Sequence, residues 1–196
     1  MKSLVHLAFI IGAAALFAGC GRSQSVLSAT PQTAMSLPGG TSGQDLLYTD
    51  NYYALYVYTF PQGQRQATGP GYILYGECAD TSGNVYVGYQ TISGGSELLI
   101  YPHGQTEPEG GLPAKGNVAL TQCSSDPNGG NLAATGSNIL EVFPNAEYPP
   151  KKYTYPQYFS ADTCSYDDSG NLFIDGKTHS QATLLELPKG SGTSLA

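Results

Sequence analysis

The sequence contains no tryptophan, only three histidines and few charges, since 12% of its 196 residues are Asp, Glu, Lys or Arg. The eight lysines and arginines are scattered along the chain, which argues against a nucleic-acid partner because such partners require clustered positive charge. No segment after residue 40 keeps apolar residues at helical spacing. Three common motifs of active sites are also missing, namely G-x-S-x-G, H-E-x-x-H and a glycine-rich phosphate loop. We therefore assign no catalytic residue, metal ligand or cofactor.

Tyrosine and glycine, by contrast, are abundant, with 15 and 25 residues. Low charge with many Tyr, Gly, Thr and Asn is typical of an all-β domain outside the cytoplasm. One sequence pattern occurs three times, beginning at Cys78, Cys123 and Cys164. It consists of a cysteine, an aspartate turn with Gly and Asn, a short apolar run, and a second apolar run that ends before proline.

The apolar–proline pairs give the period of this repeat. They end at Pro61, Pro102, Pro144 and Pro188, at intervals of 41, 42 and 44 residues. A unit of roughly 40–50 residues with several short strands has the size of one β-propeller blade.

Each unit predicts antiparallel strands joined by tight hairpins. Asp80 and Asp167 begin the clearest turns, because an aspartate carboxylate accepts backbone N–H groups and the glycine that follows supplies a positive φ. The runs after the turns, such as residues 85–87, and those before the prolines, such as residues 184–187, include apolar residues at successive positions. This pattern predicts burial on both faces of each sheet, as between packed blades.

Residues 76–87 read G-E-C-A-D-T-S-G-N-V-Y-V and resemble the NHL-type repeat, whose pattern is G-hydrophobic-A-V-D-x-x-G-N-hydrophobic-Y-V. The resemblance covers residues 45–190, although cysteine stands where the family usually has alanine and the turn after Cys123 is enlarged. It implies a β-propeller, usually with six blades. The family includes binding scaffolds as well as lactonases and lyases, so the resemblance does not settle function.

With the four strands of a blade numbered outward from the axis, the successive units hold strands 2–4, 1–4, 1–4 and 1–3. We therefore predict about three and a half blades in residues 44–196 and an incomplete ring, as if further blades once followed. A six-bladed ring would need on the order of 250 residues. Three outcomes stay open: an open arc that self-associates through its exposed edges, a ring made from two chains, or a four-bladed ring completed by the chain end or the tether.

Residues 1–19 predict a signal peptide, in which Lys2 precedes an apolar stretch of about 14 residues, shorter than the roughly 20 that an ordinary membrane-spanning helix needs. The segment L-F-A-G-C that ends at Cys20 resembles the lipobox of bacterial lipoproteins, with Phe17 at a position that is usually aliphatic. The resemblance implies export, cleavage before Cys20 and lipid attachment to its sulfur. Gly21 resembles an outer-membrane sorting signal, which in a two-membrane cell implies the outer membrane or the periplasmic face. A plain secretory signal with an incidental cysteine is the alternative.

Residues 20–43 are rich in Ser, Thr, Gln, Gly and Pro. They cannot bury enough apolar surface to offset the entropy of ordering, which predicts a flexible tether. Such a tether suits a propeller segment that is held away from a membrane surface by a lipid anchor.

Few residues are candidates for a site. His103 and His179 are predicted at opposite ends of their blades, so one metal ion could hardly use both. The turn aspartates Asp80, Asp126 and Asp167 suggest calcium, which needs about six to eight converging oxygens. Each aspartate is, however, already explained by its own hairpin.

Tyrosines are the other candidates. They could line a carbohydrate- or peptide-binding face, or they could pack between blades, which is the more common role of strand tyrosines. The tyrosines considered are Tyr52, Tyr53, Tyr56 and Tyr58.

Three cysteines remain after lipidation of Cys20, in a compartment that favours disulfides. Cys78, Cys123 and Cys164 occupy the same position on the innermost strands of successive blades. Packed sheets lie about 10 Å apart, whereas a disulfide needs Cα atoms within about 7 Å. We therefore expect all three to be free.

The sequence thus predicts an exported, lipid-anchored β-propeller segment that acts as a binding or scaffolding module for a protein or carbohydrate ligand. The alternative is a lactonase- or lyase-like propeller enzyme of the cell envelope.

If Cys20 carries the lipid, the expressed protein partitions into detergent, because two or more acyl chains anchor a protein firmly. Cys20→Ser is expected to shift the protein to a soluble or unprocessed form in a detergent phase-separation assay. A soluble wild-type protein with a free Cys20 thiol would contradict lipidation.

Overall fold

The computed structural model describes residues 45–69, 73–91, 93–116, 119–136 and 138–189. The chain divides into two compact units, residues 1–38 and 39–196, and all described residues belong to the second unit. The predicted signal peptide, Cys20 and the whole of the predicted tether, residues 20–43, lie outside the described residues. Within the described part of the chain, no helix is long and apolar enough to cross a membrane.

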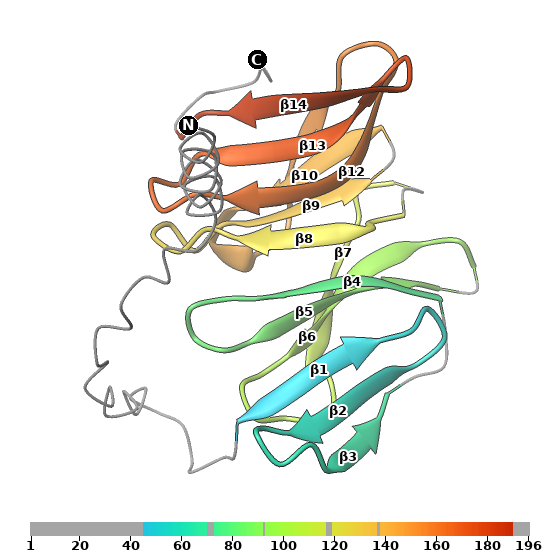
Figure 1. Ribbon diagram of the computed structural model, residues 1–196, viewed down its shortest axis with the longest axis vertical. Helices are drawn as coiled ribbons and strands as arrows, with labels where there is room; N and C mark the ends of the chain where they lie inside the picture. The colour runs from blue at the N-terminus through green and yellow to red at the C-terminus, as the bar shows by residue number, and fades with distance from the viewer. Residues whose placement is uncertain (1–44, 70–72, 92, 117–118, 137, 190–196) are drawn as a thin grey trace, which may run out of the picture. The chain divides into compact units, whose positions relative to one another are not determined.

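The described residues form fourteen strands in four antiparallel sheets (Figure 1). The first sheet contains β1 (Leu46–Asp50), β2 (Leu55–Thr59) and β3 (Arg65–Thr68), and the second contains β4 (Ile73–Ala79), β5 (Val85–Gln90), β6 (Ser96–Tyr101) and β7 (Gly110–Pro113). The third contains β8 (Gln122–Ser125), β9 (Leu132–Gly136), β10 (Ile139–Phe143) and β11 (Lys151–Thr154), and the fourth contains β12 (Phe159–Tyr166), β13 (Leu172–Thr178) and β14 (Gln181–Leu187). A short 3₁₀ turn, η1 (Pro144–Ala146), follows β10. The predicted all-β class, with units of three, four, four and three strands in an incomplete propeller-like arrangement, is confirmed.

The aspartate hairpins form as predicted. Asp80 Oδ1 accepts the backbone N–H groups of Ser82 and Asn84, both at 2.9 Å. Gly83 takes a φ of 82° to close the turn. The Asp167 turn repeats these bonds to Ser169 and Asn171, which explains why the Asp–x–x–Gly–Asn sequence recurs at this place in the repeat.

The hydrophobic core consists of three clusters, each between two successive sheets. Strand β5 contributes side chains to two of these clusters. Val85 and Val87 belong to the cluster between the first and second sheets, whereas Tyr86 belongs to the cluster between the second and third sheets. Alternate residues of a strand point to opposite faces, so apolar residues at successive positions fill both cores.

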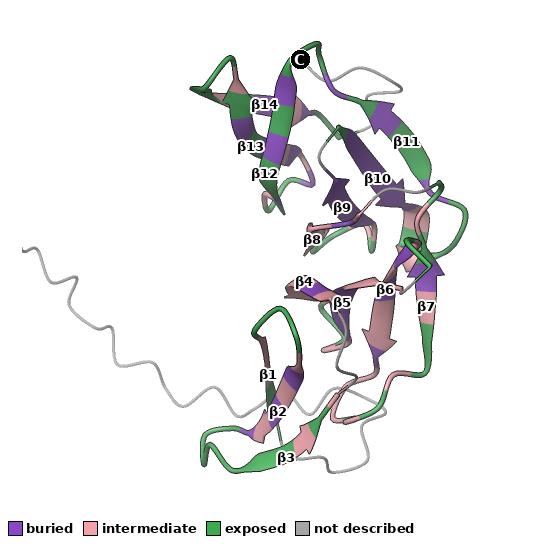
Figure 2. Cartoon of the chain, turned by 90° about the vertical axis from the view of Figure 1, so that its right-hand side faces the viewer, coloured by how far each residue is buried: buried purple, intermediate pink, exposed green. Residues whose placement is uncertain are grey.

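Burial on both faces is nevertheless limited to the second and third sheets. Every residue of β9 and β10 is buried (Figure 2). In the fourth sheet burial alternates along β13 and β14, and Leu184 is 64% exposed. The prediction of two buried faces is therefore wrong for residues 184–187, because among the described residues only one face of that sheet is covered.

The prediction of three free cysteines is also wrong. Cys78 and Cys123 form a disulfide between β4 and β8, with their Cα atoms 5.6 Å apart. Of the three cysteines that the structure describes, Cys164 alone is free, and it is buried. The innermost strands approach much more closely than the faces of packed sheets, since Gly76 N donates to Thr121 O at 2.9 Å. A Cβ atom at Gly76 would overlap the side-chain amide of Gln122.

A buried carboxylate fixes the crossing from the second sheet to the third. Glu141 lies in the middle of β10 with no exposed surface, and its two carboxylate oxygens accept the backbone N–H of Lys115 at 3.0 and 3.1 Å. Burial raises the pKa of Glu141, against the opposing effects of this hydrogen bond and the charges of Lys152 and Lys115. Because Lys115 lies in the connection between β7 and β8, Glu141 positions the chain where it changes sheets.

The disulfide predicts a specific thiol count. Alkylation of the denatured, unreduced protein is expected to label Cys164 but neither Cys78 nor Cys123, and Cys164 is labelled only after denaturation because it is buried. Cys123→Ser is expected to lower the free energy of unfolding by about 2–4 kcal/mol, since the bridge closes a loop with a sequence separation of 45 residues. Cys164→Ala, which leaves the bridge intact, is the control. Labelling of all three thiols in the wild type would contradict the bridge.

Candidate binding grooves between successive sheets

Two grooves open at the end of the sheets that carries the aspartate turns. The groove between the third and fourth sheets, here called the basic groove, has a volume of about 280 Å³. Its lining residues are Asn131, Val142, Pro144, Lys151, Tyr153, Tyr166, Gly170, Leu172, Leu187, Pro188 and Lys189.

The groove between the second and third sheets, here called the acidic groove, has a volume of about 430 Å³. Its lining residues are Asp80, Thr81, Ser82, Asn84, Tyr86, Ser125, Gly130, Leu132, Asn145, Ala146 and Glu147.

The two grooves occupy the same place in successive repeats. Leu132 of the acidic groove and Leu172 of the basic groove are the first residues of β9 and β13. Asn145 and Lys189 each come directly after the proline that follows the third strand of a unit. A similar backbone therefore presents different side chains in the two grooves.

Each sheet supplies one lysine and one tyrosine to the basic groove. Lys151 and Tyr153 lie two residues apart on β11 and so share one face of that strand. Tyr166 ends β12, and Lys189 follows β14. The four polar side chains thus face the groove from both of its walls.

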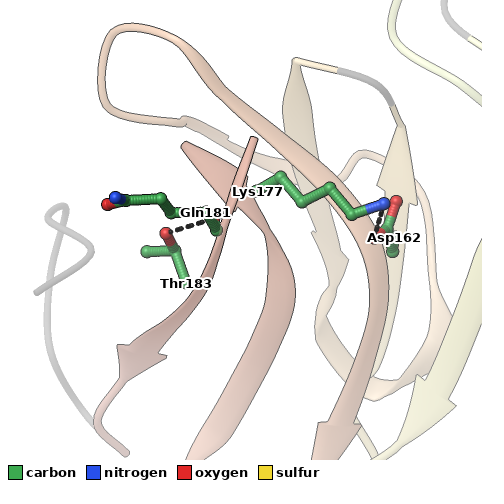
Figure 3. A network of polar contacts seen from close by, with 4 residues as sticks. All are labelled: Asp162, Lys177, Gln181 and Thr183. Carbon is green, nitrogen blue, oxygen red and sulfur yellow. Dashed lines mark hydrogen bonds and ion pairs between the residues drawn. The ribbon is translucent and has the colours of Figure 1, made fainter. Parts of the chain in front are cut away.

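Neither lysine of the basic groove forms an ion pair with a described residue. The only ion pair in the described part of the chain joins Lys177 and Asp162 at 3.7 Å, on β13 and β12 (Figure 3). The Lys189 side chain lies against Gly170, with its Cδ and Nζ atoms 3.1 and 3.3 Å from where a Cβ atom would be. Gly170 therefore leaves the space that this side chain occupies.

The two tyrosines of the basic groove are neutral hydrogen-bond donors at physiological pH. Burial raises the pKa of Tyr153. Burial, and then the charge of Asp126, raise the pKa of Tyr166. Tyr166 is held in place through its backbone N–H, which donates to Ser124 Oγ at 3.0 Å across the two sheets.

The acidic groove contains groups that are already bound to one another. Asp80 Oδ2 accepts hydrogen bonds from Asn84 Nδ2 at 2.8 Å and from the Tyr86 hydroxyl at 3.0 Å. Burial and the Asp80 charge raise the pKa of Tyr86 to about 12. Asp80, Asn84 and Tyr86 therefore already use part of the hydrogen-bonding capacity of this larger groove.

The predicted histidines lie apart, in the connections expected for them. His103 follows β6, beside Gly83. His179 lies between β13 and β14, where its ring packs against the Tyr158 ring in a tilted arrangement at a centroid distance of 4.5 Å. No three His, Cys, Asp or Glu side chains converge on a point among the described residues. The turn aspartates serve their own hairpins, and Asp126 Oδ1 accepts the backbone N–H of Asn128 at 2.9 Å.

The predicted tyrosines fall into two groups. Tyr56 and Tyr58 lie on β2 and are half-buried. Tyr52 and Tyr53 lie instead in the connection between β1 and β2, exposed, with their rings 4.9 Å apart in an edge-to-face arrangement. Tyr75 adds a third ring 6.2 Å from Tyr52. These aromatic rings do not line either groove.

A pair of carboxyl groups joins the first and second sheets. Burial, and then the neighbouring Asp50 carboxylate, raise the pKa of Glu77 to about 7. Glu77 lies on β4 next to a register irregularity, and Asp50 ends β1. In addition, Leu74 N on β4 donates to Tyr52 O, in the connection that follows β1, at 2.9 Å.

Comparisons with known proteins support the architecture. No family model and no curated protein sequence matches this chain. Among solved structures, it is similar to the hydrazine synthase of Kuenenia stuttgartiensis, with a TM-score of 0.61 and 11% identity over 76% of this chain and 44% of that chain. It is also similar to a complex of KlAtg21 with the coiled-coil of AgAtg16, with a TM-score of 0.58 and 12% identity over 76% of this chain and 51% of that chain. The chain thus spans about half the length of these structures or less, and at this identity the likeness shows the fold alone.

The basic groove had no counterpart among the sequence-based candidates. Lys151 and Lys189 lie far apart in a chain with few charges, and no motif joins them. The repeat alone could have indicated one of these residues. The residue after the repeated proline differs from unit to unit, being His103, Asn145 or Lys189.

The carboxyl pair predicts a pH-dependent stability. The pKa of Glu77 in the folded protein, about 7, lies above its ordinary value of 4.5. The folded state therefore binds this proton more tightly than the unfolded chain does, so the stabilising contribution is complete below about pH 4.5 and is lost as the pH rises towards 7. The free energy of unfolding of Glu77→Gln, relative to that of the wild type, is therefore expected to increase as the pH rises from about 5 to about 8.

Urea unfolding of both proteins at the two pH values measures this difference. Glu109→Gln, at an exposed position, is the control and should show no such gain. If the difference in free energy of unfolding between the wild type and Glu77→Gln is the same at both pH values, the raised pKa of Glu77 is contradicted.

Proposed function

We propose that this protein is an exported, lipid-anchored, NHL-like β-propeller module that binds a small ligand in the basic groove. The observation that carries this proposal is the set of unpaired donors around an apolar floor between the third and fourth sheets. Ligand sites in proteins are typically concave and largely apolar, with a few placed polar groups that orient the ligand.

The size of the groove restricts the ligand. Ligand pockets commonly measure about 300–1,000 Å³, and the basic groove, at about 280 Å³, lies just below this range. It suits a small molecule, or a short portion of a peptide or sugar, better than a broad protein surface. A scaffolding role would use other surfaces of the sheets.

The walls of the groove are fixed before any ligand binds. Tyr153, Leu172 and Leu187 belong to the buried cluster between the two sheets, and the Asn128 side-chain amide donates to the Asp168 carbonyl across the same pair of sheets. Binding therefore needs little rearrangement, which favours affinity because ordering costs free energy. On this proposal, the anchor at Cys20 and the tether hold the groove outside the cytoplasm.

The absence of tryptophan allows a direct test with a single reporter. Pro144→Trp would place the only tryptophan of the full-length protein at the basic groove. Pro102→Trp would place it at the same repeat position of the second sheet, where it lines neither groove. Titration with a panel of small organic acids, sugars and amines is expected to change the emission of the first variant saturably and to leave the second unchanged.

Chromatography of the bound compounds completes the test. A binding module returns each compound chemically unchanged. No emission change with any compound would refute ligand binding in this groove, and conversion of a bound compound would favour the lactonase- or lyase-like alternative.

A further inference from the structure

The basic groove has a local charge opposite to that of the protein as a whole. The chain has a formal net charge of −7 and only eight lysines and arginines, and two of these line one groove of about 280 Å³. Lys151 and Lys189 come from different sheets and neither pairs with a described acid. Two like charges on facing walls repel each other, so an anion between them would relieve the repulsion.

The polar groups that face this groove are mainly donors. Lysine ammonium groups donate and do not accept. The Tyr153 and Tyr166 hydroxyls, which form no hydrogen bond with the described residues, are free to donate. Asp126 is the nearby acid, but it is 2% exposed and its oxygens accept from Asn128 N and Asn131 Nδ2. The groove thus offers donors without a competing exposed carboxylate.

The floor between these donors is apolar. Val142, Leu172 and Leu187 line the groove and belong to the buried cluster between the sheets. An inorganic anion would leave this surface unused, whereas an organic anion would cover it and gain from its removal from water. The corresponding acidic groove is lined by no lysine, and its lining includes the acidic residues Asp80 and Glu147.

We propose that the basic groove binds a small organic carboxylate, with the carboxylate held between the ammonium groups of Lys151 and Lys189 and the hydrocarbon part against Leu172 and Leu187. This inference rests on the proposed binding function and specifies its ligand class. The phenol hydroxyls of Tyr153 and Tyr166 supply further hydrogen bonds to the anion.

Isothermal titration of the full-length protein tests the charge of the ligand. The probe is 3-phenylpropionate, and the matched probe is 3-phenylpropanamide, which has a similar shape without the charge. The carboxylate is expected to bind at least about tenfold more tightly than the amide, because charge-assisted hydrogen bonds are stronger than neutral ones. Added salt should weaken carboxylate binding through screening, and inorganic phosphate, which cannot use the apolar floor, should bind more weakly than the carboxylate.

Single substitutions test the positions. Lys151→Gln and Lys189→Gln are each expected to weaken carboxylate binding about tenfold, the effect of losing one charge-assisted bond, while amide binding stays the same. Lys177→Gln is the matched control, since Lys177 lies on the fourth sheet but pairs with Asp162 (Figure 3). Thermal melting of each variant checks that the fold is kept.

Several results would overturn the inference. Equal binding of carboxylate and amide, or an equal loss in Lys177→Gln, would exclude recognition of the charge by this lysine pair. If sugars or amines change the Pro144→Trp emission whereas carboxylates do not, the groove is a binding site of another ligand class, so the inference fails and the proposed function stands. If no compound changes the emission, both fail.

Discussion

The fold depends on the burial of apolar faces between successive sheets. In the part of the chain that the structure describes, no sheet of three or four strands encloses a core by itself, and the buried residues form three clusters that each lie between two neighbouring sheets. In repeat architectures the unit becomes stable only when it stacks on the next. Val85 and Tyr86 are adjacent in sequence and belong to different clusters, so a change on one strand affects both of its neighbours.

The same packing explains where the sheets touch and where they leave space. At the innermost strands the backbones come within hydrogen-bonding distance, as Gly76 and Thr121 show, and the disulfide between Cys78 and Cys123 lies there. Sheets arranged around an axis separate outward, so gaps form between the later strands of one unit and the next. On the wall formed by the third sheet, the basic groove is lined by Lys151 and Tyr153 of β11, the strand farthest from β8 in its sheet. On the wall formed by the fourth sheet, it extends from Tyr166 at the end of β12 to Lys189 after β14.

Much of this architecture could be predicted from the sequence because the repeat carries local information. The Asp80 turn is specified by the residues within it, since an aspartate carboxylate and a glycine with positive φ are enough to form the hairpin. The strand count of each unit followed from the spacing of turns and prolines. The disulfide could not be predicted in the same way, because it depends on how closely two strands from different sheets approach. The exposure of Leu184 likewise depends on what covers a face of the sheet, which the residue pattern of β14 does not record.

The candidate site shows how a repeat can vary chemistry without changing its backbone. The position after the repeated proline holds His103, Asn145 or Lys189, in each case close to the turn of the same unit. At Lys189 the side chain passes over Gly170 and reaches the groove, whereas His103 occupies the corresponding space over Gly83. A glycine that is required for its positive φ thus also leaves room for the side chain after the proline. One constraint of hairpin geometry therefore creates a position at which each unit can present a different functional group. At this position the basic groove has the ammonium group of Lys189, whereas the acidic groove has the neutral amide of Asn145.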